Sequence, residues 1–209
     1  MKTFIVASLP VKSPKDITKV RAINSDFVEL RLDYMNSLQQ IDIRNLLKFK
    51  RKIIVTIRDV SEGGINFIDK EEKRNFLMKL YKHGILYDVE ASFLKEHSVP
   101  YKGKIVSAHY FGSLPSFFEV SKLAKKFTKG TFAFKVAVNG VGNYRQLLIS
   151  LLMMSNNVAV MPMNTNPLER IAFAILGSKL VYGYVETPTA HGQMSYMQVK
   201  RIMRTLSSA

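Results

Sequence analysis

The chain has 209 residues, of which 47% are hydrophobic, no cysteine, and a formal net charge of +15 at pH 7. Its length suits one hydrophobic core, so we expect a single domain over residues 1–209, and the absence of cysteine excludes disulfides and thiolate metal sites. Because no apolar run approaches the ~20 residues that span a membrane and MKTFIVASLPVK is a poor secretory signal, we expect a cytoplasmic protein without a membrane partner.

Eight short runs rich in β-branched and aromatic residues predict β-strands, and amphipathic stretches between them predict helices. The strands are expected at residues 4–8, 27–33, 52–59, 85–90, 104–110, 131–139, 158–163 and 180–186, and the helices at 37–49, 68–83, 116–127, 143–154 and 167–176. This alternation predicts an α/β protein with a parallel sheet, and eight units in this length fit a (β/α)8 TIM barrel of nearly minimal size. An open doubly wound sheet is the alternative, although no glycine-rich phosphate loop follows the first strand.

Polar side chains occupy alternate positions in several predicted strands. Because alternate residues of a strand share a face, these side chains lie on one face and bulky apolar ones on the other. Parallel strands are normally covered on both sides, so the polar face must meet the interior, and barrel active sites form at the C-terminal strand ends. The residues on this face are Glu29, Arg31, Asp33, Thr56, Arg58, Asp88, Glu90, Ser107 and His109, with Met161 and Met163 in the seventh strand.

Lys135 is the charged centre of the predicted strand TFAFKVAVN. A lysine in a strand usually lies on a solvated face, because it is almost never buried without a partner. Here, however, Ala133 and Ala137 flank Lys135 on its own face, which is typical of a crowded interior that leaves room for a functional side chain. In an enclosed site, desolvation favours the neutral amine, which is a nucleophile.

The strong positive charge fits either a nucleic acid or an acidic small molecule. The lysine-rich stretches 48–52, 122–129 and 200–204 lie mostly where helices are expected, and neither an RNP-like strand nor a recognition-helix motif accompanies them. We therefore expect a small-molecule substrate and no nucleic-acid partner. The four histidines show no metal-ligand spacing, so no metal is expected.

Five segments together resemble the type I 3-dehydroquinate dehydratase family, which uses a Schiff base in the shikimate pathway of aromatic amino-acid biosynthesis. They are ELRLD (29–33), TIRDVSEGG (56–64), SAHYF (107–111), FKVAV (134–138) and TAHGQMS (189–195), and they occur in the family's order over nearly the whole chain. The resemblance implies dehydration of 3-dehydroquinate to 3-dehydroshikimate by a lyase of the hydro-lyase type.

The resemblance also implies three catalytic residues. Lys135 would form an imine with the ring ketone, which acidifies the adjacent carbon and makes elimination feasible without a cofactor. His109 would remove that proton and return one to the departing hydroxyl. Glu62 would orient and charge the histidine.

The resemblance further implies residues that bind the substrate ring. Glu29, Arg31 and Arg58 would hold the ring hydroxyls, or form a buried ion network, and the two roles are compatible. Met161 and Met163 would line the site, although core packing explains a methionine equally well.

The carboxylate-binding segment departs from the family pattern. Arg170 would bind the carboxylate, but the segment MNTNPLER before it lacks the family's lysine, glycine and serine and is one residue shorter. Thr189 replaces a usual serine, Gln193 is in place, and His191 replaces a usual proline, so whether His191 touches the substrate stays open.

Two alternatives from other classes remain. A class I aldolase shares the fold and the lysine chemistry but breaks a carbon–carbon bond, and the arginines at the strand ends and the TAHGQMS loop disfavour it. A basic RNA-binding protein with a vestigial barrel would bind with a steep salt dependence. The sequence does not decide between a monomer and a homodimer.

Overall fold

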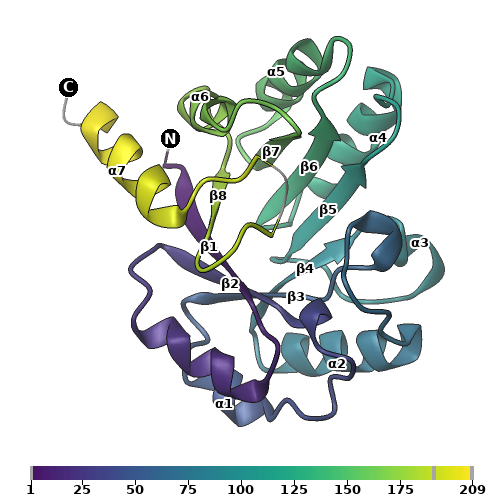
Figure 1. The fold of residues 1–209 in the computed structure, drawn as a ribbon. Helices are drawn as coiled ribbons and strands as arrows, with labels where there is room; N and C mark the ends of the chain where they lie inside the picture. The colour runs from purple at the N-terminus through teal and green to yellow at the C-terminus, as the bar shows by residue number, and fades with distance from the viewer. Residues whose placement is uncertain (1, 190–191, 208–209) are drawn as a thin grey trace.

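The computed structural model describes residues 2–189 and 192–207 and contains one eight-stranded parallel sheet (Figure 1). Its strands are β1 (Phe4–Pro10), β2 (Phe27–Arg31), β3 (Ile53–Thr56), β4 (Leu86–Glu90), β5 (Ile105–Tyr110), β6 (Ala133–Asn139), β7 (Val158–Met163) and β8 (Leu180–Tyr184). The order is β7-β6-β5-β4-β3-β2-β1-β8, and the Lys179 amide donates to the Val158 carbonyl at 2.9 Å across the remaining seam. The predicted (β/α)8 barrel is confirmed, and the doubly wound alternative is wrong.

Helices surround the strands and connect them. They are α1 (Ile43–Leu47), α2 (Lys70–Lys82), α3 (Phe93–Glu96), α4 (Phe117–Phe127), α5 (Tyr144–Met154), α6 (Leu168–Ile175) and α7 (Tyr196–Ser207), with 3-10 helices η1 (Pro14–Arg21), η2 (Leu32–Tyr34) and η3 (Val60–Glu62). The helix expected at 37–49 is wrong in its first turns, because Asp42 caps α1 by accepting from the Arg44 amide. The short elements η1, η2, η3 and α3 lie outside the stretches named as predicted helices.

The longest helix, α2, has clear sequence determinants. The Asp69 side chain accepts hydrogen bonds from the amides of Glu71 and Glu72, which are otherwise unpaired at a helix start. Acidic residues occupy its first turn and Lys79 and Lys82 its last turn, as the helix dipole favours. Its buried face therefore packs on the barrel in a fixed position.

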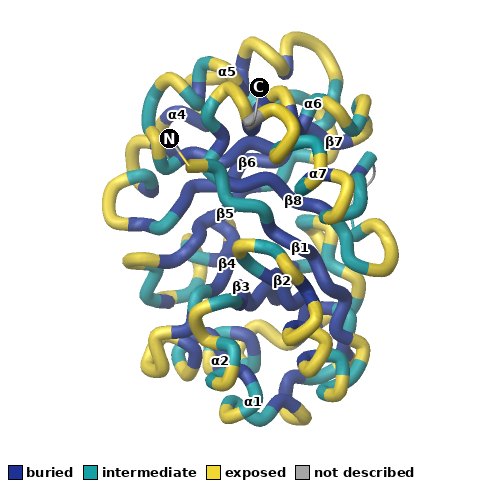
Figure 2. The backbone as a smooth tube through the Cα atoms, turned by 90° about the vertical axis from the view of Figure 1, so that its left-hand side faces the viewer, coloured by how far each residue is buried: buried dark blue, intermediate teal, exposed yellow. Residues whose placement is uncertain are grey.

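Apolar side chains pack on both faces of the strands, and Figure 2 shows that most strand residues are buried. Residues such as Leu30, Val55 and Val136 point outward and pack under the helices. The interior at the N-terminal end is closed by a separate apolar cluster, above a plug of aromatic rings. Phe4, Phe27 and Phe132 form this plug, with ring centroids 5.4–5.8 Å apart. In the described residues, this packing closes the N-terminal end of the interior, so a ligand would enter from the C-terminal end.

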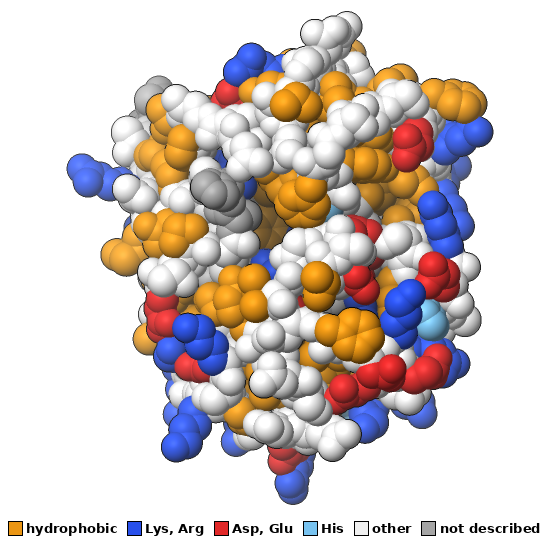
Figure 3. Space-filling view, turned by 45° about the vertical axis from the view of Figure 1, so that its right-hand side comes forward, with side chains coloured by type: hydrophobic (Ala, Val, Ile, Leu, Met, Phe, Trp, Pro, Cys, Tyr) orange, Lys and Arg blue, Asp and Glu red, His pale blue; other side chains and the backbone are white. Residues whose placement is uncertain are grey.

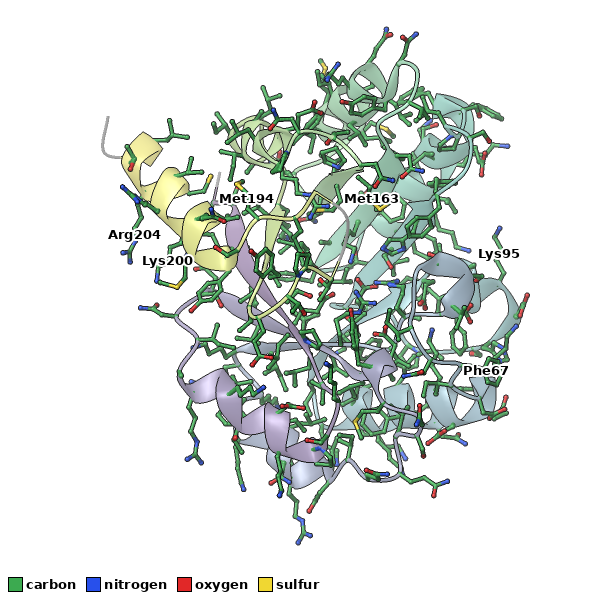
Figure 4. All side chains as sticks on the ribbon, viewed as in Figure 1. Phe67, Lys95, Met163, Met194, Lys200 and Arg204 are labelled. Atoms are coloured by element: carbon green, nitrogen blue, oxygen red, sulfur yellow. The ribbon has the colours of Figure 1, made fainter. Side chains whose placement is uncertain are left out.

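The molecular surface carries much of the positive charge. Lys200 and Arg204, for example, lie on α7 outside the barrel (Figure 4). In the part of the chain that the structure describes, no helix is both long and apolar enough to cross a membrane.

Candidate active site

A cavity of about 230 Å³ opens at the C-terminal ends of the strands, and Figure 3 shows a hollow with largely hydrophobic visible walls on this face. Its lining contains every site residue predicted from the sequence. They are Glu29, Arg31, Arg58, Glu62, His109, Lys135, Met161, Met163, Arg170, Thr189 and Gln193, joined by Gly63, Phe111, Ala137, Asn164 and Tyr182. His191, whose role was left open, lies outside the described residues.

Lys135 lies inside the barrel and is 6% exposed. Its ammonium donates to Asp88 Oδ2 at 2.8 Å, and its Nζ lies 4.8 Å from the centroid of the Tyr182 ring. Ala133 and Ala137 are buried beside it, as the sequence pattern indicated. The lysine is therefore enclosed and paired, which excludes the solvated-strand interpretation.

A buried ion network holds Asp88 in place beneath the cavity. Arg58 contacts Asp88 Oδ2 at 2.8 Å and donates to Ser107 at 2.7 Å, while its Nη1 lies 3.3 Å from Glu90. Glu90 in turn accepts from buried Lys73 at 2.7 Å. Burial alone would raise the pKa of Asp88, but the neighbouring cations Arg58 and Lys135 outweigh it and hold that pKa well below its usual range. Asp88 is thus a fixed anion next to the amine.

His109 lies on β5, next to the strand that carries Lys135. Ser107 pairs in register with Lys135, so His109 stands one interior position nearer the cavity mouth. Its Nδ1 lies 2.8 Å from Glu62 Oε2, and a carboxylate there favours the tautomer with hydrogen on Nδ1. Burial, together with Arg58 and Lys135, lowers the pKa of His109 well below its ordinary value. At neutral pH the imidazole is uncharged, and its Nε2 can accept a proton.

Glu62 reaches His109 from a loop that depends on two glycines. Gly63 ends η3 with φ of 86°, and a Cβ at Gly64 would lie 2.1 Å from the Arg58 carbonyl oxygen. The other oxygen of Glu62 accepts from the Ser92 hydroxyl, and burial raises the pKa of the Glu62 carboxyl. Glu62 is therefore held between Ser92 and the histidine.

Glu29 and Arg31 form the opposite wall of the cavity. Glu29 accepts from the Ser8 hydroxyl at 2.5 Å and from the Thr56 hydroxyl at 2.9 Å. Arg31 forms a bidentate pair with Asp33, at 2.8 Å from Nε and 2.7 Å from Nη2. Both residues are thus fixed by partners and border the cavity, and their binding of a substrate stays a prediction.

The segments after β7 and β8 supply the outer rim, with Arg170 in the first turn of α6. Arg170 donates from Nε to the Pro162 carbonyl at 3.2 Å, and burial lowers its pKa to about 10. Gln193 Oε1 accepts from both the amide and the hydroxyl of Thr189, at 2.9 and 3.0 Å. This leaves the amide NH₂ of Gln193 to serve a ligand. Met163, labelled in Figure 4, lines the cavity from the end of β7.

Several residues of the site were not predicted. Asp88 and Ser107 were recognised only as polar strand residues, and nothing in the sequence pairs them with Lys135 and Arg58. Ser92 and Tyr182 were not singled out at all. Their distance along the chain from their partners explains this, because only the closed barrel brings them together. Within residues 2–189 and 192–207, no three His, Asp or Glu side chains could hold a metal ion together.

Comparisons with known proteins show the family and the fold of the chain. Residues 3–209 match the family model described as type I 3-dehydroquinase. The chain is 46% identical to the 3-dehydroquinate dehydratase of Metallosphaera sedula, over 98% of each chain, and 44% identical to that of Sulfolobus acidocaldarius, over 98% of this chain and 94% of the relative. The structure of the type I 3-dehydroquinate dehydratase from Clostridium difficile has the same fold, with a TM-score of 0.79 and 21% identity over 99% of this chain and 93% of that one.

Proposed function

Because this chain belongs to the type I 3-dehydroquinase family, we propose that it dehydrates 3-dehydroquinate to 3-dehydroshikimate through an imine on Lys135. The observation that carries the proposal is the buried Lys135 amine, which borders the same cavity as the His109–Glu62 pair. The class I aldolase and RNA-binding alternatives are set aside, since the family match spans residues 3–209.

Imine formation begins with the Lys135 amine. The ammonium releases a proton, the nitrogen attacks the ketone carbon, and the resulting carbinolamine loses its hydroxyl as water to leave an iminium. The cavity positions the nitrogen for this reaction, because Asp88 accepts from it at 2.8 Å while Arg58 shares the same carboxylate oxygen. The iminium inherits the positive charge of the ammonium, so the buried Asp88 anion stabilises both.

The elimination follows at the carbon next to the iminium. Neutral His109 takes a proton from this carbon, the electrons move into the iminium, and the hydroxyl on the following carbon leaves with a proton from the same histidine. Glu62 stabilises the imidazolium that exists between the two transfers, because its carboxylate lies 2.8 Å from Nδ1. Hydrolysis of the product imine then frees Lys135.

The polar walls of the cavity fit the substrate's ring and carboxylate. Glu29, Arg31 and Arg58 would bind the ring hydroxyls, and Met161 and Met163 would pack against the apolar edge of the ring. Arg170, Thr189 and Gln193 would bind the carboxylate from the rim. Arg170 is buried, and a buried guanidinium binds an anion more strongly than an exposed one, because water does not screen it.

Borohydride reduction tests the proposed intermediate directly. Borohydride added together with 3-dehydroquinate should leave a stable adduct on Lys135, because it reduces an iminium to an amine. Mass spectrometry of a protease digest locates the modified lysine. Turnover without any adduct, or an adduct on a different lysine, would refute the imine mechanism.

The carboxylate site is tested by shortening two of its three proposed ligands. Arg170→Ala should raise KM by about 10- to 150-fold, because a hydrogen bond between charged groups contributes ~1.5–3 kcal/mol. Gln193→Ala should raise KM only about 2- to 12-fold, since its amide makes a neutral bond of ~0.5–1.5 kcal/mol. Steady-state kinetics of both variants measure this order. Unchanged kinetics in Arg170→Ala would mean that the carboxylate binds elsewhere.

A further inference from the structure

Tyr182 borders the active-site cavity, but the proposed mechanism gives it no part. It lies on β8 in register with Val6 of β1, within the apolar cluster below the polar residues of the cavity. Its side chain is 5% exposed and lines the cavity, and the Nζ of Lys135 lies over its ring at 4.8 Å from the centroid. Its ring thus forms part of the wall next to the lysine.

The Tyr182 hydroxyl is unusual because it has no hydrogen-bond partner. Among buried side-chain polar atoms of residues 2–189 and 192–207, only this oxygen and His97 Nε2 lack one. His97 stacks on Phe93 at 4.5 Å, at the end of α3, and does not line the cavity. Tyr182 is therefore the exception in a cavity whose other polar side chains are paired.

An unpaired buried hydroxyl destabilises a folded protein, because it has lost its hydrogen bonds to water. A phenylalanine would fill the same place without this loss. The nearest carboxylates do not use the hydroxyl either. Glu29 already accepts from Ser8 and Thr56, and Asp88 from Ser107 and Lys135. The hydroxyl is consistent with a partner that arrives with the ligand.

We propose that the Tyr182 hydroxyl donates a hydrogen bond to the ketone oxygen of the substrate while Lys135 adds to the ketone carbon. This assignment rests on the proposed function, since it needs the imine on Lys135. Nζ lies over the ring at 4.8 Å from its centroid and makes no hydrogen bond with the phenol, so the hydroxyl is left to bond the oxygen on the carbon that Nζ attacks.

Lys135 adds to the ketone, and the adduct then loses water. The ammonium of Lys135 releases one proton to solvent, the nitrogen lone pair forms the C–N bond, and the C=O π pair moves onto the oxygen. A proton passes from nitrogen to that oxygen, which gives the carbinolamine. A solvent proton then joins the hydroxyl, water leaves, and the nitrogen lone pair forms the iminium. Tyr182 stabilises the negative charge that develops on the oxygen and keeps its own proton throughout.

The environment keeps Tyr182 in the state that a donor needs. Burial raises the pKa of Tyr182 well above its ordinary value, and the nearby Glu29 and Asp88 carboxylates raise it further. The phenol is therefore protonated throughout the neutral range. It acts as a donor that polarises the carbonyl, in the manner of an oxyanion hole.

Tyr182→Phe removes only the hydroxyl and keeps the ring, and Tyr87→Phe is the matched control. Tyr87 is also buried, but it lies outside the cavity and its hydroxyl donates to the Pro100 carbonyl. Tyr182→Phe should form the borohydride-trapped Lys135 adduct roughly 10²- to 10³-fold more slowly at saturating 3-dehydroquinate, as expected for loss of one donor to a developing oxyanion. Its melting temperature should be unchanged or higher. Tyr87→Phe should melt at a lower temperature with adduct formation at the wild-type rate.

Rapid-quench trapping and thermal melts distinguish the outcomes. Slower adduct formation without loss of stability in Tyr182→Phe supports the assignment. Adduct formation at the wild-type rate overturns the assignment. A raised KM would then place the hydroxyl on another group of the substrate. An unchanged KM would mean that the hydroxyl bonds water or nothing. Wild-type protein without turnover or adduct would instead refute the proposed function itself.

Discussion

Replacing Lys135 with alanine is expected to abolish dehydration and borohydride trapping together. Among the described residues that line the cavity, Lys135 is the only amine that can form the iminium, so the electron sink for the elimination is lost. We expect kcat to fall by more than about 10⁴-fold, which is over ~5 kcal/mol of transition-state stabilisation at 1.36 kcal/mol per decade. A steady-state assay and mass spectrometry of borohydride-treated variant measure both effects.

Two further variants keep this test specific. Lys135→Met retains most of the side-chain volume, and Asp88 keeps Arg58 as a partner, so the barrel should still fold by circular dichroism. Lys73→Met removes another buried lysine of the same network, which pairs with Glu90 and does not line the cavity. It should lower stability, because a buried carboxylate loses a partner, but it should keep a trappable adduct on Lys135. Persistent turnover by folded Lys135→Met would contradict the imine mechanism.

The strand side chains that face the barrel interior could be predicted, because side-chain direction along a strand alternates with a period of two residues. Side chains at alternate positions share a face, so Glu29 and Arg31 on one strand and Ser107 and His109 on another had to point the same way. Parallel strands buried on both faces then left only the barrel interior for them. This rule is local, and it explains why the strand residues Glu29, Arg31, His109 and Lys135 line one cavity.

The ion pairs and hydrogen bonds between side chains inside the barrel could not be predicted, because they depend on how the strands are staggered. Asp88 pairs in register with Ile105, whereas Lys135 pairs with Ser107, yet the long lysine side chain reaches across β5 to the carboxylate. The missing partner of the Tyr182 hydroxyl is likewise a property of the assembled barrel. In the sequence LVYGYVE, this tyrosine is an ordinary strand residue.

Helix limits depended on capping and on the paths of loops. The polar stretch before α1 was expected to be helical, but Asp42 begins the helix later by binding the Arg44 amide. The strand expected at 27–33 ends at Arg31, because Leu32–Tyr34 turn into η2. That turn brings Asp33 back to Arg31 as a bidentate partner. Because the strand was expected to continue to residue 33, the sequence did not predict this pair.

His109→Ala should separate proton transfer from covalent attachment. The variant keeps Lys135 and its pairing with Asp88, so it should still bind 3-dehydroquinate and form a trappable adduct on Lys135. Turnover should fall by about 10²- to 10⁴-fold, or ~3–5 kcal/mol, which is the usual contribution of a positioned general base.

The matched control is His83→Ala, since His83 is exposed at the end of α2 and does not line the cavity. It should leave kcat, KM and the adduct unchanged, and circular dichroism should show that both variants are folded. Near-normal turnover in folded His109→Ala would show that another group moves the proton. Glu62 would then be the first candidate, because it already lies at hydrogen-bond distance from the histidine ring, and Asp88 and Glu90 would follow. Low turnover with an intact adduct would leave His109 as the group that completes the elimination after Lys135 has bound the substrate.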